Sequence, residues 1–412
     1  MQKPKENAGL SDEATTAINP RAAGPFALAG AALLGGGFVL GLLQRDHLAY
    51  FLHSYLVSVC FVASLCLGAL FFVAVLHATR AGWGIVLRRI AEFLSVNIAT
   101  VAVLFLPVLV AVIMRNHWLY EWLDAERMRE GSKHYSELLA IKRPYFQVFF
   151  YVARSVGYFV IWWALARFFF TRSLKQDESG DPNLTLQMER WSGPSLLLFA
   201  VSLTFAAFDW LMSLTPEWYS TIFGLYFFAG CVVSGLSSIV LSAVMLQATG
   251  RLKSVITPEH YHDMGKLLLG FVIFWGYMGF SQYMLIWYGN IPEETVWYQA
   301  RQTNGWALIS LALLFGHLLI PFFGLLSREV KRRRHLLAFW AVWLLVFHWI
   351  DLYWVVMPSL EQKRPQFGLL DVAVALGILS LYLAGLALVA GGKSLVARKD
   401  PRLGESLAFE NY

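Results

Sequence analysis

Charged residues are scarce in this chain: they make up 15% of its 412 residues, whereas hydrophobic residues make up 58%. Soluble domains carry about 25% charged residues. Such a composition cannot cover the water-facing surface of a protein of this length, which excludes a soluble enzyme or binding domain. We predict an all-α integral membrane protein.

Cysteine is also rare, with three residues, Cys60, Cys66 and Cys231, all inside apolar runs. They form no CxxC, no CxxCH and no zinc-type spacing. We therefore expect this chain to bind no iron–sulfur cluster, no c-type haem and no metal. The three thiols are interpreted as small apolar fillers in helix packing.

A signal-peptide type of apolar run is missing from the first 25 residues, so we expect a polar tail and no cleaved leader. The net charge of +6 comes from basic residues scattered among short loops. That pattern is typical of membrane topology signals, and it gives no support to nucleic-acid binding.

Ten apolar runs have the length of about 20 residues that crosses a bilayer. They predict a transmembrane domain over 26–390, between an N-terminal tail (1–25) and a C-terminal tail (391–412). An even number of spans places both tails on one side, and that side collects most of the 33 lysines and arginines, which makes it cytoplasmic by the positive-inside rule. The predicted spans are 26–43, 50–76, 92–114, 145–170, 194–215, 221–247, 265–290, 305–326, 336–358 and 370–390.

The loop at 115–144 is the longest predicted on the outer side. It contains two Trp-Leu pairs, 118–119 and 122–123, followed by a charged stretch. This pattern predicts a short amphipathic helix on the outer surface, with a solvated connector as the alternative. Tryptophans at the predicted outer ends of spans are expected to anchor the outer face; they are Trp210, Trp218, Trp287, Trp297 and Trp306.

Asp209 and Asp351 lie at matching places near the outer ends of the fifth and ninth spans, and each is followed by Trp, Met, Pro and Glu in the same order. The two groups of helices run in the same direction. We therefore predict two similar four-helix bundles, spans 2–5 and 6–9, flanked by spans 1 and 10.

An acid at the centre of a transmembrane helix costs roughly 2.5 to 3.5 kcal/mol to insert, so such a residue should have a partner, a proton or a function. Arg154, at similar depth on the fourth span, is predicted to form a structural ion pair with Asp209. His348 shares a helix face with Asp351, and His317 lies at similar depth on the eighth span. These groups suit a proton path, although the inventory alone does not make the path continuous.

Glu92 and Lys266, at the inner boundary, would extend such a path, together with Asp209 and Arg154. For Glu92 and Lys266 we favour side chains that reach to the lipid headgroups. A haem clamped between His317 and His348 is an alternative, but bulky neighbours favour a packed core for this pair.

A quinone would need an apolar slot with one or two hydrogen-bonding groups, open to lipid near a membrane face. The candidates for such a slot on the outer side are His53, Asp209, Gln282 and Tyr283. Ordinary hydrogen bonds between helices are the alternative for each of them.

Several longer phrases carry a family resemblance that runs through nearly all ten spans. With them the chain resembles alternative complex III, in particular its second large membrane subunit, a relative of the polysulfide-reductase type of membrane anchor. The phrases are Tyr145-Phe146, Arg154 to Phe159, Phe208 to Leu214, Trp218 to Ile222, Leu225-Tyr226, Phe280 to Tyr288, Ile291 to Thr295, Asp351 to Trp354 and Met357-Pro358.

The resemblance implies a multi-subunit respiratory complex of the bacterial inner membrane that oxidises menaquinol or ubiquinol. Its partners would be a homologous ten-helix subunit, an iron–sulfur/molybdopterin-like subunit, multihaem c-type cytochromes and small membrane subunits, with lipids around it and a terminal oxidase as a further partner. Haem and iron–sulfur clusters would lie in those partners, and the quinol-oxidising pocket chiefly in the homologous subunit. The resemblance carries over Asp209, Arg154, His348 and Asp351 as candidate functional residues.

The expected function is therefore support of quinol oxidation and proton translocation by a subunit with no redox cofactor and no catalytic residue of its own. One alternative is direct quinol binding by this chain. Another is a stand-alone secondary transporter, which should have helices interrupted near the midplane. Pro107 and Pro321 interrupt their spans only in part.

Overall fold

The computed structural model describes residues 18–43, 48–360 and 364–411, and within these ranges it is all-α with ten helices long and apolar enough to cross a membrane. The all-α membrane class is therefore confirmed. The N-terminal tail falls mostly outside the described residues. The spans are α2 (Ala23–Leu42), α3 (Ala49–Ala78), α4 to α6 (Ile85–Val96, Ile98–Leu104, Leu106–Ile113), α8 (Val148–Ser179), α9 (Asn183–Trp210), α10 (Phe223–Ala248), α11 (Pro258–Gly289), α13 with η5 and α14 (Trp306–Leu313, Leu314–Leu319, Ile320–Leu326), α16 (Arg334–Val356) and α17 (Leu369–Ala390).

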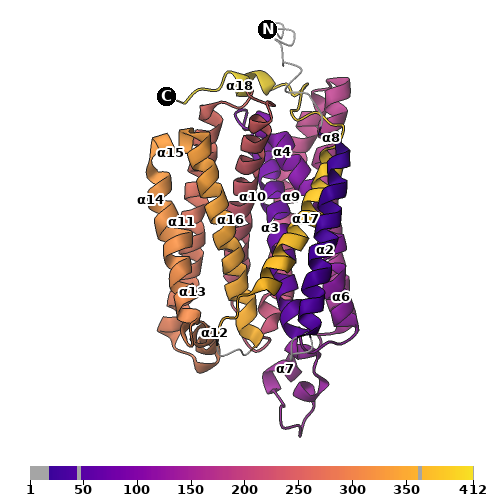
Figure 1. The fold of residues 1–412 in the computed structure, drawn as a ribbon, viewed down its shortest axis with the longest axis vertical. Helices are drawn as coiled ribbons and strands as arrows, with labels where there is room; N and C mark the ends of the chain where they lie inside the picture. The colour runs from indigo at the N-terminus through magenta and orange to yellow at the C-terminus, as the bar shows by residue number, and fades with distance from the viewer. Residues whose placement is uncertain (1–17, 44–47, 361–363, 412) are drawn as a thin grey trace.

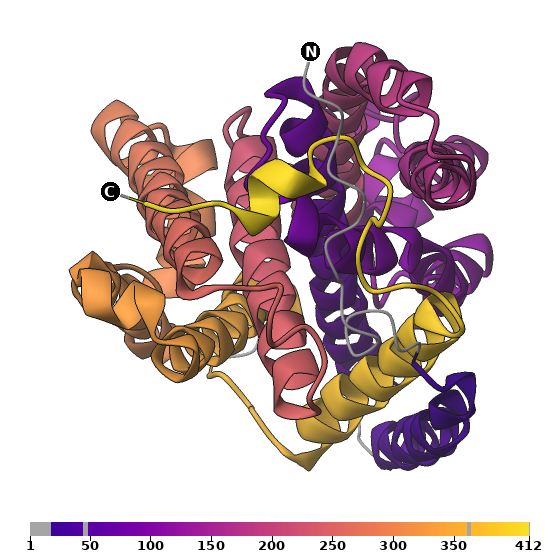
Figure 2. The same cartoon turned by 90° about the horizontal axis from the view of Figure 1, so that it is seen from above.

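Helices α3 and α10 lie side by side at the centre, with α4 to α9 on one side and α11 to α16 on the other (Figures 1 and 2). The flanking helices α2 and α17 pack against each other beside α3. The central pair approaches closely at Gly68 and Gly235, where an added Cβ on Gly68 would lie 1.9 Å from the carbonyl oxygen of Cys231. Small residues thus allow the two bundles to share one core.

Helices α8 and α9 extend well past the predicted inner ends, because polar residues continue both helices beyond the apolar stretch. They join at Gly180, whose φ of +68° falls in the left-handed region that glycine adopts readily. The third span is divided at Asn97 and Phe105, and the eighth contains the π-helix η5.

The outer loop does not form the amphipathic helix predicted for Trp118 to Leu123. It contains two 3-10 turns, η2 (Glu121–Leu123) and η3 (Ala125–Met128), and the short helix α7 (Glu137–Ile141). Leu119 and Trp122 are buried against the first bundle. Protein contacts thus bury Leu119 and Trp122 of this stretch, while Trp118 stays exposed.

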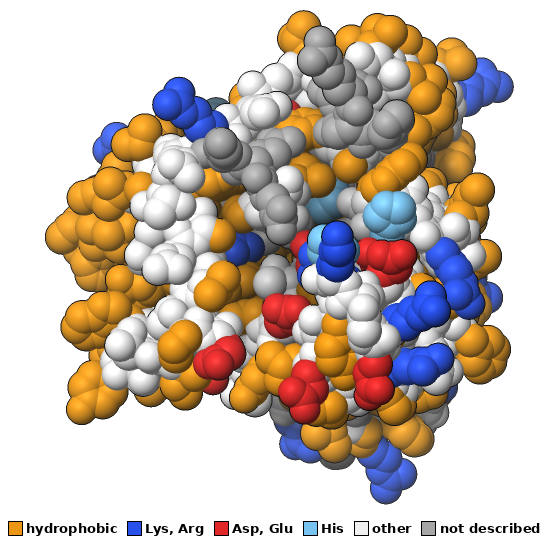
Figure 3. Space-filling model, turned by 90° about the horizontal axis from the view of Figure 1, so that it is seen from below, with side chains coloured by type: hydrophobic (Ala, Val, Ile, Leu, Met, Phe, Trp, Pro, Cys, Tyr) orange, Lys and Arg blue, Asp and Glu red, His pale blue; other side chains and the backbone are white. Residues whose placement is uncertain are grey.

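The prediction that five tryptophans anchor the outer face is wrong for four of them. Trp210, Trp218, Trp297 and Trp306 are buried, while Trp287 is exposed. Trp218 stacks on Trp297 with ring centroids 4.5 Å apart. These rings fill the core at the end of the molecule opposite the termini, where charged side chains of both signs gather beside an apolar rim (Figure 3).

At the terminal end, the segment after α17 crosses the helices as a strap that includes α18 (Leu403–Leu407; Figure 2). Asp400 of the strap pairs with Arg88 at 2.7 Å, and Arg88 also pairs with Glu92 at 3.1 Å. Arg89 bridges Glu92 and Asp177. Glu92 is therefore fully buried in an ion network, so the expectation that it reaches to the headgroups is wrong.

Lys266 has the surface position that a side chain reaching to the headgroups needs. Its side chain is 49% exposed and pairs with Asp263 at the surface.

Candidate functional site

The Asp209 carboxylate is enclosed by groups from the first bundle. Arg154 donates to both of its oxygens, from Nε and Nη2, each at 2.8 Å. The hydroxyls of Tyr145 and Tyr158 donate one hydrogen bond to each oxygen at 2.7 Å. The predicted ion pair between Arg154 and Asp209 is confirmed, and it is bidentate.

Four donors leave the Asp209 carboxylate little capacity for another ligand, because a carboxylate has about four lone-pair sites. A cavity of about 220 Å³ lies nearby, lined by Tyr145 and Ser213, but Asp209 is not part of its lining. Its neighbours thus hold this carboxyl group in place, and the structure does not present it to a quinone.

The Asp351 carboxylate has a different set of partners. Tyr226 donates to Oδ1, and the indole nitrogen of Trp275 donates to Oδ2 at 3.2 Å. Among the described residues, His348 is the one basic side chain within ion-pair range, with Nδ1 3.9 Å from Oδ2. Asp351 is 2% exposed, so it is a buried acid whose neighbours supply hydrogen bonds but no permanent cation.

His348 links this acid to the centre of the molecule. Its Nε2 lies 3.0 Å from the Ser64 hydroxyl of α3, which in turn lies 3.0 Å from the Ser234 hydroxyl of α10. Gly230 makes room for the ring, because an added Cβ there would lie 2.6 Å from the imidazole. The predicted proximity of His348 and Asp351 is confirmed.

His317 comes from the π-helix η5 and packs against Trp275, with ring centroids 4.0 Å apart and ring planes inclined by 41°. Its ring centroid is 6.2 Å from that of His348. Within the described chain neither ring nitrogen of His317 has a hydrogen-bond partner. Trp275 and the backbone at Gly230 thus pack directly on the two imidazoles, as in a dense core, and this arrangement does not support a haem between them.

A cavity of about 660 Å³ adjoins the Asp351 site, since Tyr226 and Trp275 belong to its lining. Gln282 and Tyr283 also line it, as the quinone interpretation requires. The lining residues Phe280, Leu311 and Leu314 are exposed on the apolar surface. The volume lies within the range of about 300 to 1,000 Å³ typical of small-molecule sites.

The other two quinone candidates lie elsewhere. His53 is buried with Nδ1 2.8 Å from the carbonyl oxygen of Ala49, and it does not line the large cavity. Asp209 is held in the first bundle. Gln282 itself is engaged, because its amide group donates to Tyr298 at 3.0 Å and accepts from Ser220 at 3.1 Å.

The predicted spans 265–290 and 305–326 place Arg301 in a loop on the outer side, but in the structure Arg301 belongs to α12 (Pro292–Gln302) and is buried. It donates to the carbonyl oxygens of Trp354 and Val355, at the end of α16, and lies 3.4 Å from the Trp297 ring centroid. Burial lowers the pKa of Arg301 to about 9, which still leaves a cation at neutral pH. It stabilises the helix end that carries Asp351.

The repeat between the bundles is visible in one pair of contacts. The indole of Trp210 donates to Ser155 at 3.0 Å, and the indole of Trp354 donates to Ser310 at 2.8 Å. In both bundles the tryptophan is on the fourth helix and the serine on the third. The acids differ, because Asp209 takes its partners from α8 and the preceding loop, whereas Asp351 takes them from α10 and α11.

The sequence did not identify Tyr226 and Trp275 as partners of Asp351, or Ser64 as a partner of His348. Each of these three residues places a polar atom on an otherwise apolar helix, which a sequence does show. Many side chains that only form hydrogen bonds between helices have the same property, so it does not single out these three. The structure does not bring Glu92 or Lys266 to Asp351: Glu92 belongs to the network of the first bundle, and Lys266 pairs at the surface. A scan of protein-family models and a search of curated proteins find no match to this chain.

Proposed function

We propose that this chain is a membrane subunit of a respiratory quinol:electron-acceptor oxidoreductase of the alternative complex III type, in the bacterial inner membrane with both termini in the cytoplasm. Its second bundle handles protons around Asp351, and electron transfer belongs to partner subunits that hold haem and iron–sulfur clusters. The proposal is supported by the resemblance in sequence and by the surroundings of Asp351.

The observation that carries the proton role is the set of groups around Asp351. A buried carboxyl group with hydrogen-bond donors but no permanent cation has no fixed partner that locks it in one protonation state, so it is suited to take up and release a proton. Nδ1 of His348 lies 3.9 Å from Oδ2 of Asp351. The ring of His317, whose nitrogens have no partner among the described residues, lies 6.2 Å from the ring of His348 between centroids. These side chains could exchange a proton with small rotations or through one water.

Asp351→Asn in the assembled complex should lower the number of protons translocated per electron in reconstituted vesicles and leave assembly intact. Asparagine can accept from Trp275 and donate to Tyr226, so the hydrogen bonds of the site survive while the titratable group is lost. Glu293→Gln, an exposed acid at the same end of the molecule, is the matched control. An unchanged ratio of protons to electrons in Asp351→Asn would end the proton proposal.

The complex itself is tested by purification in mild detergent. We expect multihaem c-type and iron–sulfur polypeptides to accompany this chain, with haem absorption in the visible spectrum. A chain that purifies without such companions would contradict the respiratory assignment and favour a stand-alone transporter.

Direct quinol binding is the second candidate, because the large cavity beside Asp351 opens on the lipid-facing surface and contains Gln282 and Tyr283. Gln282→Ala should then raise the KM for quinol, since a hydrogen-bonding group is removed from the cavity. A normal KM and normal quinol turnover in Gln282→Ala would remove this candidate.

A further inference from the structure

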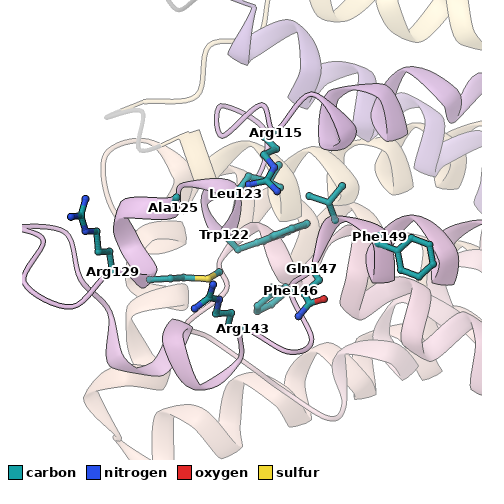
Figure 4. Close-up of a pocket in the computed structure, with 11 residues that line it drawn as sticks. Arg115, Trp122, Leu123, Ala125, Arg129, Arg143, Phe146, Gln147 and Phe149 are labelled. Carbon is teal, nitrogen blue, oxygen red and sulfur yellow. The ribbon is translucent and has the colours of Figure 1, made fainter.

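A second cavity, of about 550 Å³, lies where the outer loop meets the membrane-spanning surface of the first bundle. Arg115, Arg129 and Arg143 line it, together with apolar side chains that include Trp122 and Phe149. In Figure 4, Arg115 and Arg143 lie on opposite sides of the Trp122 ring, and Arg129 lies farther out on the loop. Three cationic side chains thus line a cavity whose other lining residues are mostly apolar.

The lining of this cavity contains no acid, and within the described chain no ion pair involves any of its three arginines. The loop has five acids, and none of them lines the cavity: Glu121 pairs with Arg127 at 2.8 Å, Asp124 accepts from the backbone of its own turn, and Glu126, Glu130 and Glu137 are exposed outside the lining. The lining of the cavity therefore contains no carboxylate that neutralises its three arginines.

Two further groups of donors belong to the same cavity. Helix α8 begins beside it, since Gln147, Val148 and Phe149 are lining residues, and this helix start has no side-chain cap and no acid in its first turn. Its first backbone N–H groups carry the partial positive charge of a helix N-terminus. The indole nitrogen of Trp122, a residue 2% exposed, also lacks an acceptor among the described atoms.

Arg115 is placed by an unusual backbone. It follows the end of α6 with a φ of +53°, in the left-handed region where glycine is the common residue at a helix end. An arginine at this position costs about 1 kcal/mol in conformational energy relative to glycine.

The helix surface next to the cavity, toward the membrane-spanning part of the molecule, is apolar and exposed. Val110 and Ile113 of α6 and Met114 just after it are exposed, and on α8 Phe149 is 81% exposed. The cations therefore lie at the level where the loop leaves the apolar part of the helices, which is the level of lipid headgroups.

We propose that this cavity binds the phosphodiester headgroup of an anionic phospholipid, with its acyl chains along the exposed residues of α6 and α8. Guanidinium groups and backbone N–H groups are the donors that hold a phosphate. A zwitterionic lipid would bring a cationic amine into a lining that offers no carboxylate. The site does not depend on the respiratory assignment, because it needs only the membrane fold.

The test is lipid retention measured by native mass spectrometry on the full chain, with or without its complex, after incubation with phosphatidylglycerol or phosphatidylcholine. We expect the wild-type chain to retain phosphatidylglycerol at least about tenfold better than phosphatidylcholine. The double variant Arg115→Gln with Arg143→Gln should lose about tenfold of that retention or more. Lys133→Gln, an exposed cation of the same loop outside the cavity, should retain phosphatidylglycerol like the wild type.

Arg143→Gln alone keeps the test valid if the double variant unfolds, since Arg143 is exposed and its replacement removes no ion pair. Equal retention of the two lipids by the wild type would overturn the proposal, as would unchanged retention in the arginine variants. Inorganic phosphate that displaces the lipid at equal concentration would show a free-anion site and would overturn the lipid assignment. So would a partner polypeptide that cross-links at the cavity while no lipid is retained.

Discussion

The two aspartates of the membrane domain occupy matching places but have different chemical surroundings. Asp209 accepts four hydrogen bonds, two of them from the Arg154 guanidinium. Asp351 accepts two hydrogen bonds from neutral donors and has a histidine at 3.9 Å. Because a bidentate guanidinium and two tyrosines hold Asp209 in place, this acid is suited to a structural role, whereas Asp351 has no permanent cation beside it and is suited to gain and loss of a proton.

Arg154→Gln should lower the thermal stability of the chain, because it leaves the Asp209 carboxylate buried without its cation. Breaking a buried pair costs about 3 to 5 kcal/mol in soluble proteins. The double variant with Asp209→Asn should recover part of this loss, since neither partner is then charged. Thermal unfolding in detergent measures both, and a double variant less stable than Arg154→Gln would contradict this explanation.

At the scale of helices, the centre of the fold depends on the close approach of α3 and α10. Gly68 and Gly235 face each other across this contact, and an added Cβ on Gly235 would lie 2.5 Å from the backbone of Gly68. The contact also brings Ser64 and Ser234 together, at the end of the hydrogen-bonded chain from His348. Helix packing and the candidate proton site are therefore coupled.

Gly68→Ala should destabilise the chain by about 1 to 3 kcal/mol or more, because the new methyl group meets backbone that cannot rotate away. Gly157→Ala on α8 is the matched control: nothing lies within 4 Å of its Cβ position, and alanine has the better helix propensity. The midpoint of thermal unfolding in detergent checks both. Similar midpoints for the two variants would show that the α3–α10 contact has room for an added methyl group.

At the scale of the whole molecule, the strap after α17 ties the terminal end of the two bundles together. Asp400 pairs with Arg88 of the first bundle. The carbonyl oxygen of Ser406 lies at hydrogen-bond distance, 3.1 Å, from Nε2 of His260 in the second bundle. Both described ends of the chain lie at this face (Figure 1). The strap therefore restrains how the bundles move against each other.

The orientation of the whole chain can be measured by labelling with a membrane-impermeant thiol reagent. The three native cysteines are buried, which keeps the background low. If the termini are cytoplasmic, Lys133→Cys should react in right-side-out vesicles and Glu410→Cys only after permeabilisation. The reverse pattern would show that the positive-inside prediction is wrong for this chain.

Hydrophobicity along the sequence determined the class, the ten spans and the Arg154–Asp209 pair, because span length and the cost of a buried charge act locally or between residues of similar depth. The tertiary structure decided the rest. It buried Trp122, Arg301 and Glu92, which the sequence placed at surfaces, because a polar or aromatic residue near a span end can meet protein as readily as lipid. The neighbours of Asp351 come from helices distant in sequence, and only their packing shows that this acid has no permanent cation beside it.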